Sequence, residues 1–99
     1  ILSMDSNFIT KLDRLKGLIY IEVEGGEIAA EMNVSFYDSG RIIIEHTLVK
    51  PKFNGKGYGK LMVEKAVVYA RQNGLRLTPI CEYAKNVIDK NEEYKDILY

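Results

Sequence analysis

Apolar and polar residues alternate most regularly over residues 28–37. Every second position in this stretch is apolar: Ile28, Ala30, Met32, Val34 and Phe36. This period of two predicts a β-strand with one face towards a core and most of the other towards solvent.

The segments on either side of this strand predict two further strands and an antiparallel meander. Residues 18–23 are rich in β-forming residues, and Gly25-Gly26 can supply the positive φ angles of a tight hairpin. Residues 38–40, Asp-Ser-Gly, predict a second turn. Residues 41–49 are apolar on both faces, which predicts a central strand that is covered on two sides.

The pattern becomes helical after this strand. Apolar residues in the stretch 60–73 are spaced for one buried helix face, and Gly74 stands where a left-handed C-terminal cap belongs. Residues 75–80 predict a short strand. Because a helix separates it from the strand over 41–49, the two strands should be parallel neighbours with a right-handed crossover.

The two ends of the chain complete the predicted fold. Phe8, Leu12 and Leu15 fall at helical spacing and predict a turn or two of helix. Residues 81–91 predict a short helix, and residues 94–99 a docked tail. The whole predicts an α+β fold, an antiparallel meander continued by one βαβ unit.

Composition fits a single domain over residues 1–99. A chain of this size buries roughly two-thirds of its extended surface, and 46% of its residues are apolar. One cysteine cannot form an internal disulfide, which favours a reducing, cytoplasmic setting. Fourteen basic and 14 acidic residues argue against a nucleic-acid binder, and no apolar run reaches the roughly 18–20 residues of a membrane span. We expect a soluble monomer or weak dimer without a metal site.

A glycine-rich loop, residues 54–60, joins the predicted central strand to the predicted helix with the sequence Asn-Gly-Lys-Gly-Tyr-Gly-Lys. Its glycines let the backbone approach a ligand, and the amides and dipole of the helix start suit a pyrophosphate. Lys56 and Lys60 add positive charge nearby. A Walker loop is excluded because Gly-Lys-Ser/Thr is absent, and an antiparallel meander does not offer a dinucleotide fingerprint. A flexible loop before a helix is the alternative.

Further motifs lie around this loop in a fixed order: Glu-His-Thr-x-Val-x-Pro over residues 45–51, Ala-x-x-x-Ala-Arg over 66–71, Pro-x-Cys-x-Tyr over 79–83 and Tyr-x-Asp over 94–96. Together with the loop, they resemble the GCN5-related N-acetyltransferases, and most closely the small single-domain YjdJ-type group, over about residues 18–98. The family's loop motif is Gln/Arg-x-x-Gly-x-Gly/Ala. Asn54 departs from it, which loses a side-chain contact and none of the backbone amides.

The resemblance implies a fold in which two parallel strands splay apart and the pantetheine arm of acetyl-CoA lies between them. The arm would pair with backbone groups near residues 47–49, and the pyrophosphate would lie on the amides of the glycine loop. The implied cofactor-binding residues are Thr47, Leu48, Val49, Asn54, Gly55, Lys56, Gly57, Tyr58, Gly59, Lys60 and Tyr83.

Cys81 is the first catalytic candidate, because it follows a strand and stands at the expected first turn of a helix, where a thiol's pKa is lowered. The resemblance implies a place near the acetyl thioester, where Cys81 would act as nucleophile or proton acceptor. The ordinary route in the family is instead direct attack by an amine with the help of a base. A small packed side chain is the third interpretation.

His46 and Glu45 are the other catalytic candidates. His46 is the only histidine of the chain, and it shares its parity with Ile42 and Ile44, which predicts a core histidine. Glu45 lies on the opposite face and is a candidate base that acts through water.

These features predict an N-acetyltransferase that moves an acetyl group from acetyl-CoA to an amine of unknown identity. The alternatives are a CoA-binding module or partner subunit without turnover, and a protein-interaction domain that binds no CoA. A chain of 99 residues leaves little for an acceptor site, so we expect that site to be shallow.

Overall fold

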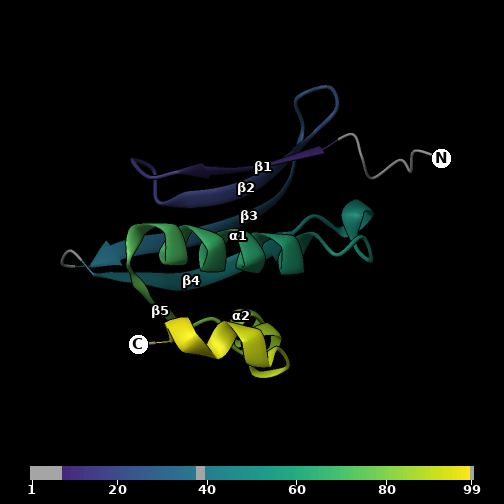
Figure 1. Ribbon diagram of the computed structural model, residues 1–99. Coiled ribbons are helices and arrows are strands. Elements are labelled where there is room, and N and C mark those ends of the chain that lie inside the picture. The colour runs from purple at the N-terminus through teal and green to yellow at the C-terminus, as the bar shows by residue number, and fades with distance from the viewer. Residues whose placement is uncertain (1–7, 38–39, 99) are drawn as a thin grey trace.

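The computed structural model describes residues 8–37 and 40–98 (Figure 1). In this part of the chain one sheet has the strand order β1-β2-β3-β4-β5. The strands are Phe8–Asp13 (β1), Leu18–Val23 (β2), Ile28–Tyr37 (β3), Arg41–Val49 (β4) and Arg76–Pro79 (β5). The helices are Pro51–Phe53 (η2), Tyr58–Asn73 (α1), Glu82–Asp89 (α2) and Glu92–Ile97 (η3).

The pairing of these strands confirms the predicted α+β fold. Strands β1 to β4 are antiparallel neighbours, and β4 pairs with β5 in parallel after the crossover through α1. Gly25 and Gly26 have the expected positive φ angles. The predicted turn at 38–40 includes two residues, Asp38 and Ser39, that lie outside the described part of the chain.

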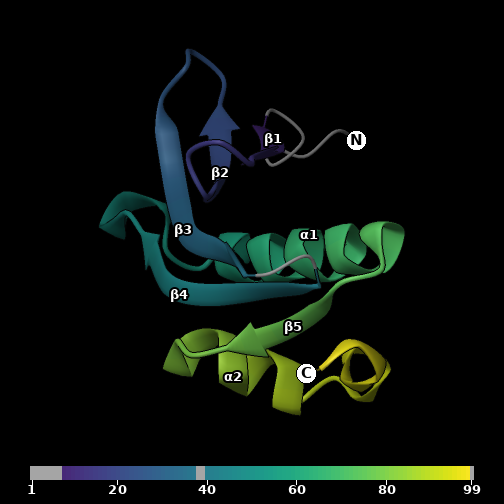
Figure 2. The same cartoon turned by 90° about the vertical axis from the view of Figure 1, so that its left-hand side faces the viewer.

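Helix α1 lies against the concave face of the curved sheet (Figure 2). Its apolar face is fully buried at Met62, Val63, Ala66, Val67 and Ala70. This face packs on the sheet core, which is equally buried at Ile19, Ile21, Met32, Ile42 and Ile44. Each large apolar side chain buried in this way stabilises the fold by about 1.5–3 kcal/mol. The helix ends at Gly74, whose φ of 66° confirms the left-handed cap.

The helix predicted from Phe8, Leu12 and Leu15 is wrong, because residues 8–13 form strand β1 beside β2. Phe8 and Leu12 are four residues apart and so lie on one face of a strand, which means that they also satisfy a period of two. Both side chains are partly buried against the core, whereas Leu15 is fully exposed in the following turn. Pairing with β2 therefore decides the structure of this segment.

Two β-bulges change which side chains face the core. In β3 the register passes from Ala30 to Ile28 and skips Ala29, so Ile28 does not continue the buried row. In β4, Val34 faces Ile44 and Asn33 faces His46, which leaves Glu45 as an extra residue. The bulge reverses the parity of the residues that follow it. The prediction of a core histidine is therefore wrong, and His46 is exposed.

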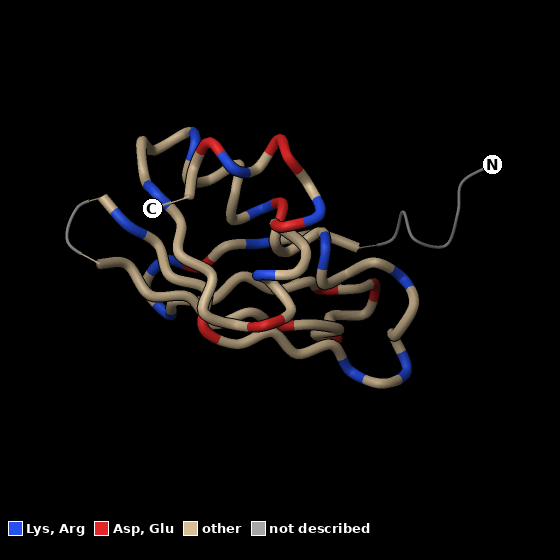
Figure 3. The backbone as a smooth tube through the Cα atoms, turned by 90° about the horizontal axis from the view of Figure 1, so that it is seen from below, with Lys and Arg blue, Asp and Glu red and all other residues tan. Residues whose placement is uncertain are grey.

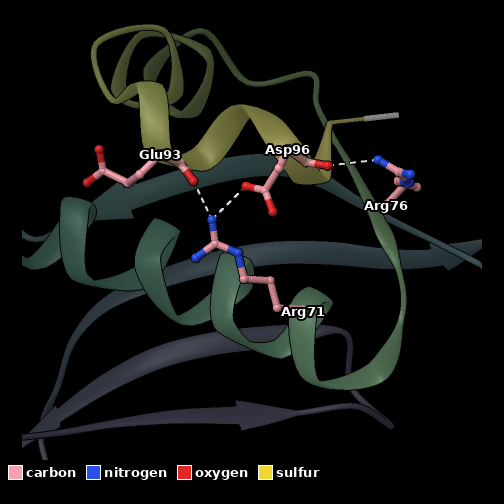
Figure 4. A network of polar contacts seen from close by, with 4 residues as sticks. All are labelled: Arg71, Arg76, Glu93 and Asp96. Carbon is pink, nitrogen blue, oxygen red and sulfur yellow. Dashed lines mark hydrogen bonds and ion pairs between the residues drawn. The ribbon is translucent and has the colours of Figure 1, made fainter.

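The C-terminal part of the chain is attached to the last turn of α1 and to the start of β5 (Figure 4). The Arg71 guanidinium donates to the backbone oxygen of Glu93 and, at 2.6 Å, to Asp96 Oδ1. Arg76 Nη1 donates to the backbone oxygen of Asp96 at 2.7 Å. These contacts confirm a docked tail, and they hold η3 beside α1.

Basic and acidic residues are interspersed along the described chain (Figure 3), as the balanced composition implies. None of the described helices has the length and hydrophobicity that a membrane crossing requires.

Candidate functional site

Strands β4 and β5 part at Ile44 and Pro79, the last pair of their parallel ladder. The Ile44 carbonyl accepts the final hydrogen bonds, from the amides of Ile80 at 2.9 Å and Cys81 at 3.3 Å. Beyond this point β4 continues to Val49, and no described strand pairs with it on that side. Pro79 cannot donate to a ladder, which fits the end of the pairing here. The parallel strands are thus splayed, as expected.

The glycine loop lies at the opening between the parted strands. Gly55 and Gly57 have φ angles of 83° and 79°, which favour glycine, and a side chain at either position would point into open space. Gly57 is the N-cap of α1 and provides no side-chain cap, and the first helical hydrogen bond runs from the Leu61 amide to the Gly57 oxygen. The amides of the first turn and the positive end of the dipole therefore suit an anion.

At Gly59 the requirement for glycine is steric and does not come from the φ angle. The residue is buried, and a Cβ atom there would lie only 2.6 Å from the Tyr83 hydroxyl oxygen. The missing side chain lets the start of α2 lie directly against the start of α1. Since Cys81 is the N-cap of α2, the beginnings of both helices meet at the point where the strands part.

A cavity of about 340 Å³ lies between the β4 edge, the glycine loop and Tyr83. Its lining residues are Thr47, Val49, Phe53, Asn54, Gly55, Gly57, Tyr58, Gly59 and Tyr83. The structure thus brings together all the residues singled out for cofactor binding except Leu48, Lys56 and Lys60.

The three exceptions lie close by. Leu48 is 63% exposed and points to the other side of the sheet, so only its backbone lies along the parted edge. Lys56 and Lys60 line an adjoining cavity of about 470 Å³ between α1 and η3. Gly57 lines both cavities, so the two lysines lie next to the loop opening without entering the first cavity.

Phe53 is the lining residue that sequence reasoning missed. Its ring is 6.0 Å from that of Tyr58, which in turn lies 5.2 Å from Phe8. The rings of Phe53 and Tyr58 give the cavity an apolar wall on the loop side. The sequence signal for Phe53 was its position directly before the glycine loop. The direction of its side chain could not be predicted, because it depends on the turn of η2.

Cys81 is not among the residues that line this cavity, but its Sγ lies 3.4 Å from the hydroxyl of Thr47, which does line it. Burial by itself raises the pKa of the thiol. The Thr47 hydroxyl and the backbone N–H groups of Ala84, Tyr83 and Thr47 favour the thiolate, and together they bring the pKa below its ordinary value. Burial and the nearby Cys81 thiolate raise the pKa of the Tyr83 phenol. The site thus places a thiol with a lowered pKa beside a phenol with a raised pKa.

Glu45 and His46 lie outside the cavity, on the convex side of the sheet. Glu45 is the extra residue of the β4 bulge, and its Oε2 accepts a hydrogen bond from the Ser35 hydroxyl at 2.7 Å. His46 is exposed beside it. The bulge therefore places two polar side chains in succession on the same side, next to the point where the strands part.

A third cavity, of about 420 Å³, lies at the turn between β2 and β3. Its lining includes the carboxylates of Glu22 and Glu24 together with Gly25 and Gly26, and it has no helix start. These features do not suit a phosphate-bearing ligand, so the parted strands are the better candidate site.

The chain matches the family model of the GCN5-related N-acetyl-transferases over residues 19–97. It is similar to the solution structure of a GCN5-like protein from Staphylococcus aureus, a proposed N-acetyltransferase, with 31% identity and a TM-score of 0.74. That match covers 95% of this chain and 90% of the other. No protein of curated function matches the sequence.

Two larger proteins share the fold at lower identity. N-acetylglutamate synthase from Neisseria gonorrhoeae, solved with coenzyme A and L-arginine, gives a TM-score of 0.59 at 16% identity, over 81% of this chain and 22% of that one. Ard1 from Thermoplasma volcanium gives a TM-score of 0.53 at 19% identity, and the match covers 62% of this chain and 43% of that one. The chain spans less than half the length of either. The family model and the Staphylococcus aureus structure agree over nearly the whole chain, which therefore belongs to the GCN5-related N-acetyltransferase family.

Proposed function

We propose that the protein transfers an acetyl group from acetyl-CoA to a primary amine. The observation that carries this proposal is the cavity at the parted strands, which joins an unpaired β4 edge to the uncapped start of α1. An extended arm with amide groups can pair with a strand edge as an added strand would. A pyrophosphate can accept hydrogen bonds from the first turn of a helix. In acetyl-CoA an arm with amide groups is followed by a pyrophosphate, just as the β4 edge is followed by the start of α1 along the cavity.

The residues of the cavity fit this ligand. The backbone of residues 47–49 would hold the pantetheine arm, and Phe53 would cover its apolar part. The amides of residues 55–60 would hold the pyrophosphate, with Lys56 and Lys60 as nearby positive charges. Under this arrangement the thioester end of the arm lies towards Thr47 and Cys81, whose side chains are 3.4 Å apart.

Cys81 is proposed as the first acceptor of the acetyl group. Its thiolate attacks the carbonyl carbon, a new Sγ–carbon bond forms, and the bond to the CoA sulfur breaks. The CoA thiolate leaves and takes up a proton from water. The lowered pKa and partial exposure of Cys81 support this role, because the thiolate is the reactive form.

The amine then attacks the acetyl group on Cys81. Glu45 accepts one proton from the incoming ammonium, the nitrogen bonds to the carbonyl carbon, and the Cys81 thiolate leaves. The second proton of the nitrogen goes to water. The amine comes from the convex side, because α1 and the core fill the concave side (Figure 2). A shallow approach of this kind suits an exposed amine on a small molecule or a protein.

Acetyl-CoA binding is tested by calorimetry on the wild type, Gly57→Asn and Gly57→Asp. Asn and Asp both tolerate the left-handed conformation, so the pair differs in charge alone. A carboxylate roughly 6 Å from a phosphate costs about 3 kcal/mol at an effective dielectric constant near 20. We therefore expect Gly57→Asp to bind at least about 10-fold more weakly than Gly57→Asn. Equal affinities of the two variants would contradict the placement of the pyrophosphate. If the wild type did not bind acetyl-CoA, the protein-interaction domain would be the better hypothesis.

The role of Cys81 is tested by intact-mass spectrometry after mixing with acetyl-CoA alone. We expect one added acetyl group on the wild type and none on Cys81→Ser. Turnover with a panel of amines, namely spermidine, a lysine-containing peptide and a peptide with a free N-terminus, should be lost in Cys81→Ala. Turnover at the wild-type rate in Cys81→Ala would show direct attack by the amine instead. Tight binding without transfer to any amine would favour the CoA-binding module.

The contribution of Thr47 to thiolate formation is tested through the pH dependence of Cys81 alkylation. Since the Thr47 hydroxyl lowers the pKa of the thiol, Thr47→Val should raise that pKa. The alkylation rate, which follows the thiolate, should then rise at a higher pH than in the wild type. Thr78→Val is the matched control, because Thr78 Oγ1 is buried without a hydrogen-bond partner in the described structure. An unchanged midpoint in Thr47→Val would refute the contact.

A further inference from the structure

The bulge in β4 coincides with the end of the β4–β5 ladder. The ladder stops at Ile44, and the extra residue, Glu45, is the next one along the chain. A bulge next to a site re-aims a side chain that a regular strand would place elsewhere. Here Glu45 keeps the convex side that regular alternation after Ile44 gives it, and the bulge turns Thr47 towards the cavity.

Ser35 of β3 reaches the Glu45 carboxylate. Val34 is buried and Phe36 packs on the core, so Ser35 between them points to the convex side. Its register partner in β4 is Ile43, two residues before Glu45. Diagonal neighbours on one sheet face are within reach of a long side chain, and the Ser35 hydroxyl donates to Glu45 Oε2 at 2.7 Å.

This hydrogen bond involves only one of the two carboxylate oxygens of Glu45. Ser35 occupies Oε2, and no described residue donates to the other carboxylate oxygen of Glu45. The contact is partly buried, so water competes with it less than at a fully exposed position. The carboxylate is therefore held at one oxygen and open at the other, beside the point where the strands part.

We propose that Ser35 is a positioning residue for the reaction, which holds the Glu45 carboxylate where the acceptor amine arrives on the convex side of the sheet. This inference rests on the proposed function, in which Glu45 takes one proton from the amine. Ser35 itself transfers no proton and touches no substrate. It fixes the direction of the carboxylate, and a small error in that direction is costly for a proton transfer.

The test is a double-mutant cycle of Ser35→Ala and Glu45→Gln, assayed with the best acceptor of the amine panel at saturating acetyl-CoA. Ser35→Ala should lower kcat about 10-fold in the wild-type background. It should change kcat little in the Glu45→Gln background, because it acts through that carboxylate. The Kd of acetyl-CoA should be the same in all four proteins. Ser35→Thr keeps the hydroxyl on a residue that suits a strand, and it should restore most of the rate.

Asn33→Ala is the matched control, since Asn33 lies on the same face of β3, two residues before Ser35, and no hydrogen bond joins its side chain to Glu45 in the described structure. It should retain the wild-type kcat. Ser35→Ala could instead lower kcat equally in the wild-type and Glu45→Gln backgrounds, or in neither. Either result would overturn the inference and leave the proposal of acetyl transfer intact. A wild type that binds acetyl-CoA and acetylates no amine would overturn the proposed function, and the inference with it.

Discussion

The backbone hydrogen bonds of β4 are the constraint on which the rest of the site depends. A strand inside a sheet needs a partner on each edge, and buried backbone groups are rarely left without one. β5 supplies that partner only as far as Ile44, after which Pro79 ends the ladder and the chain turns into α2. Residues 47–49 then have β3 on one side and a cavity on the other. A strand edge that faces a cavity is a binding surface for an extended ligand.

The starts of two helices complete this surface. Gly59 lets Tyr83 lie against the first turn of α1, so the N-termini of α1 and α2 converge on the parted strands. Each helix start carries partial positive charge. The first suits a pyrophosphate, and the second contributes the backbone N–H groups that favour the Cys81 thiolate. At the far end of α1, Arg71 binds η3 and keeps the C-terminal part in place (Figure 4).

The sequence was sufficient for the regular elements and for most of the cavity lining. Alternation over β3, helical spacing in α1 and the glycine loop are local patterns, and the structure has each of them where they were predicted. The two bulges could not be predicted, because they depend on the register between strands and not on either strand alone. The β4 bulge explains why His46 is exposed, and the register between β3 and β4 decides the Ser35 contact with Glu45, which was therefore missed. β1 was misassigned because Phe8 and Leu12 fit both periods, and only pairing with β2 decides between them.

The central claim is that the parted strands and the glycine loop form one binding site. The most direct measurement is a titration of the isotope-labelled protein with acetyl-CoA, followed through its backbone amide NMR signals. The account predicts that the largest shifts occur at residues 47–49 and 55–60, while Gly25 and Gly26 at the β2–β3 turn stay unchanged. Shifts confined to that turn, or spread evenly over the chain, would contradict it.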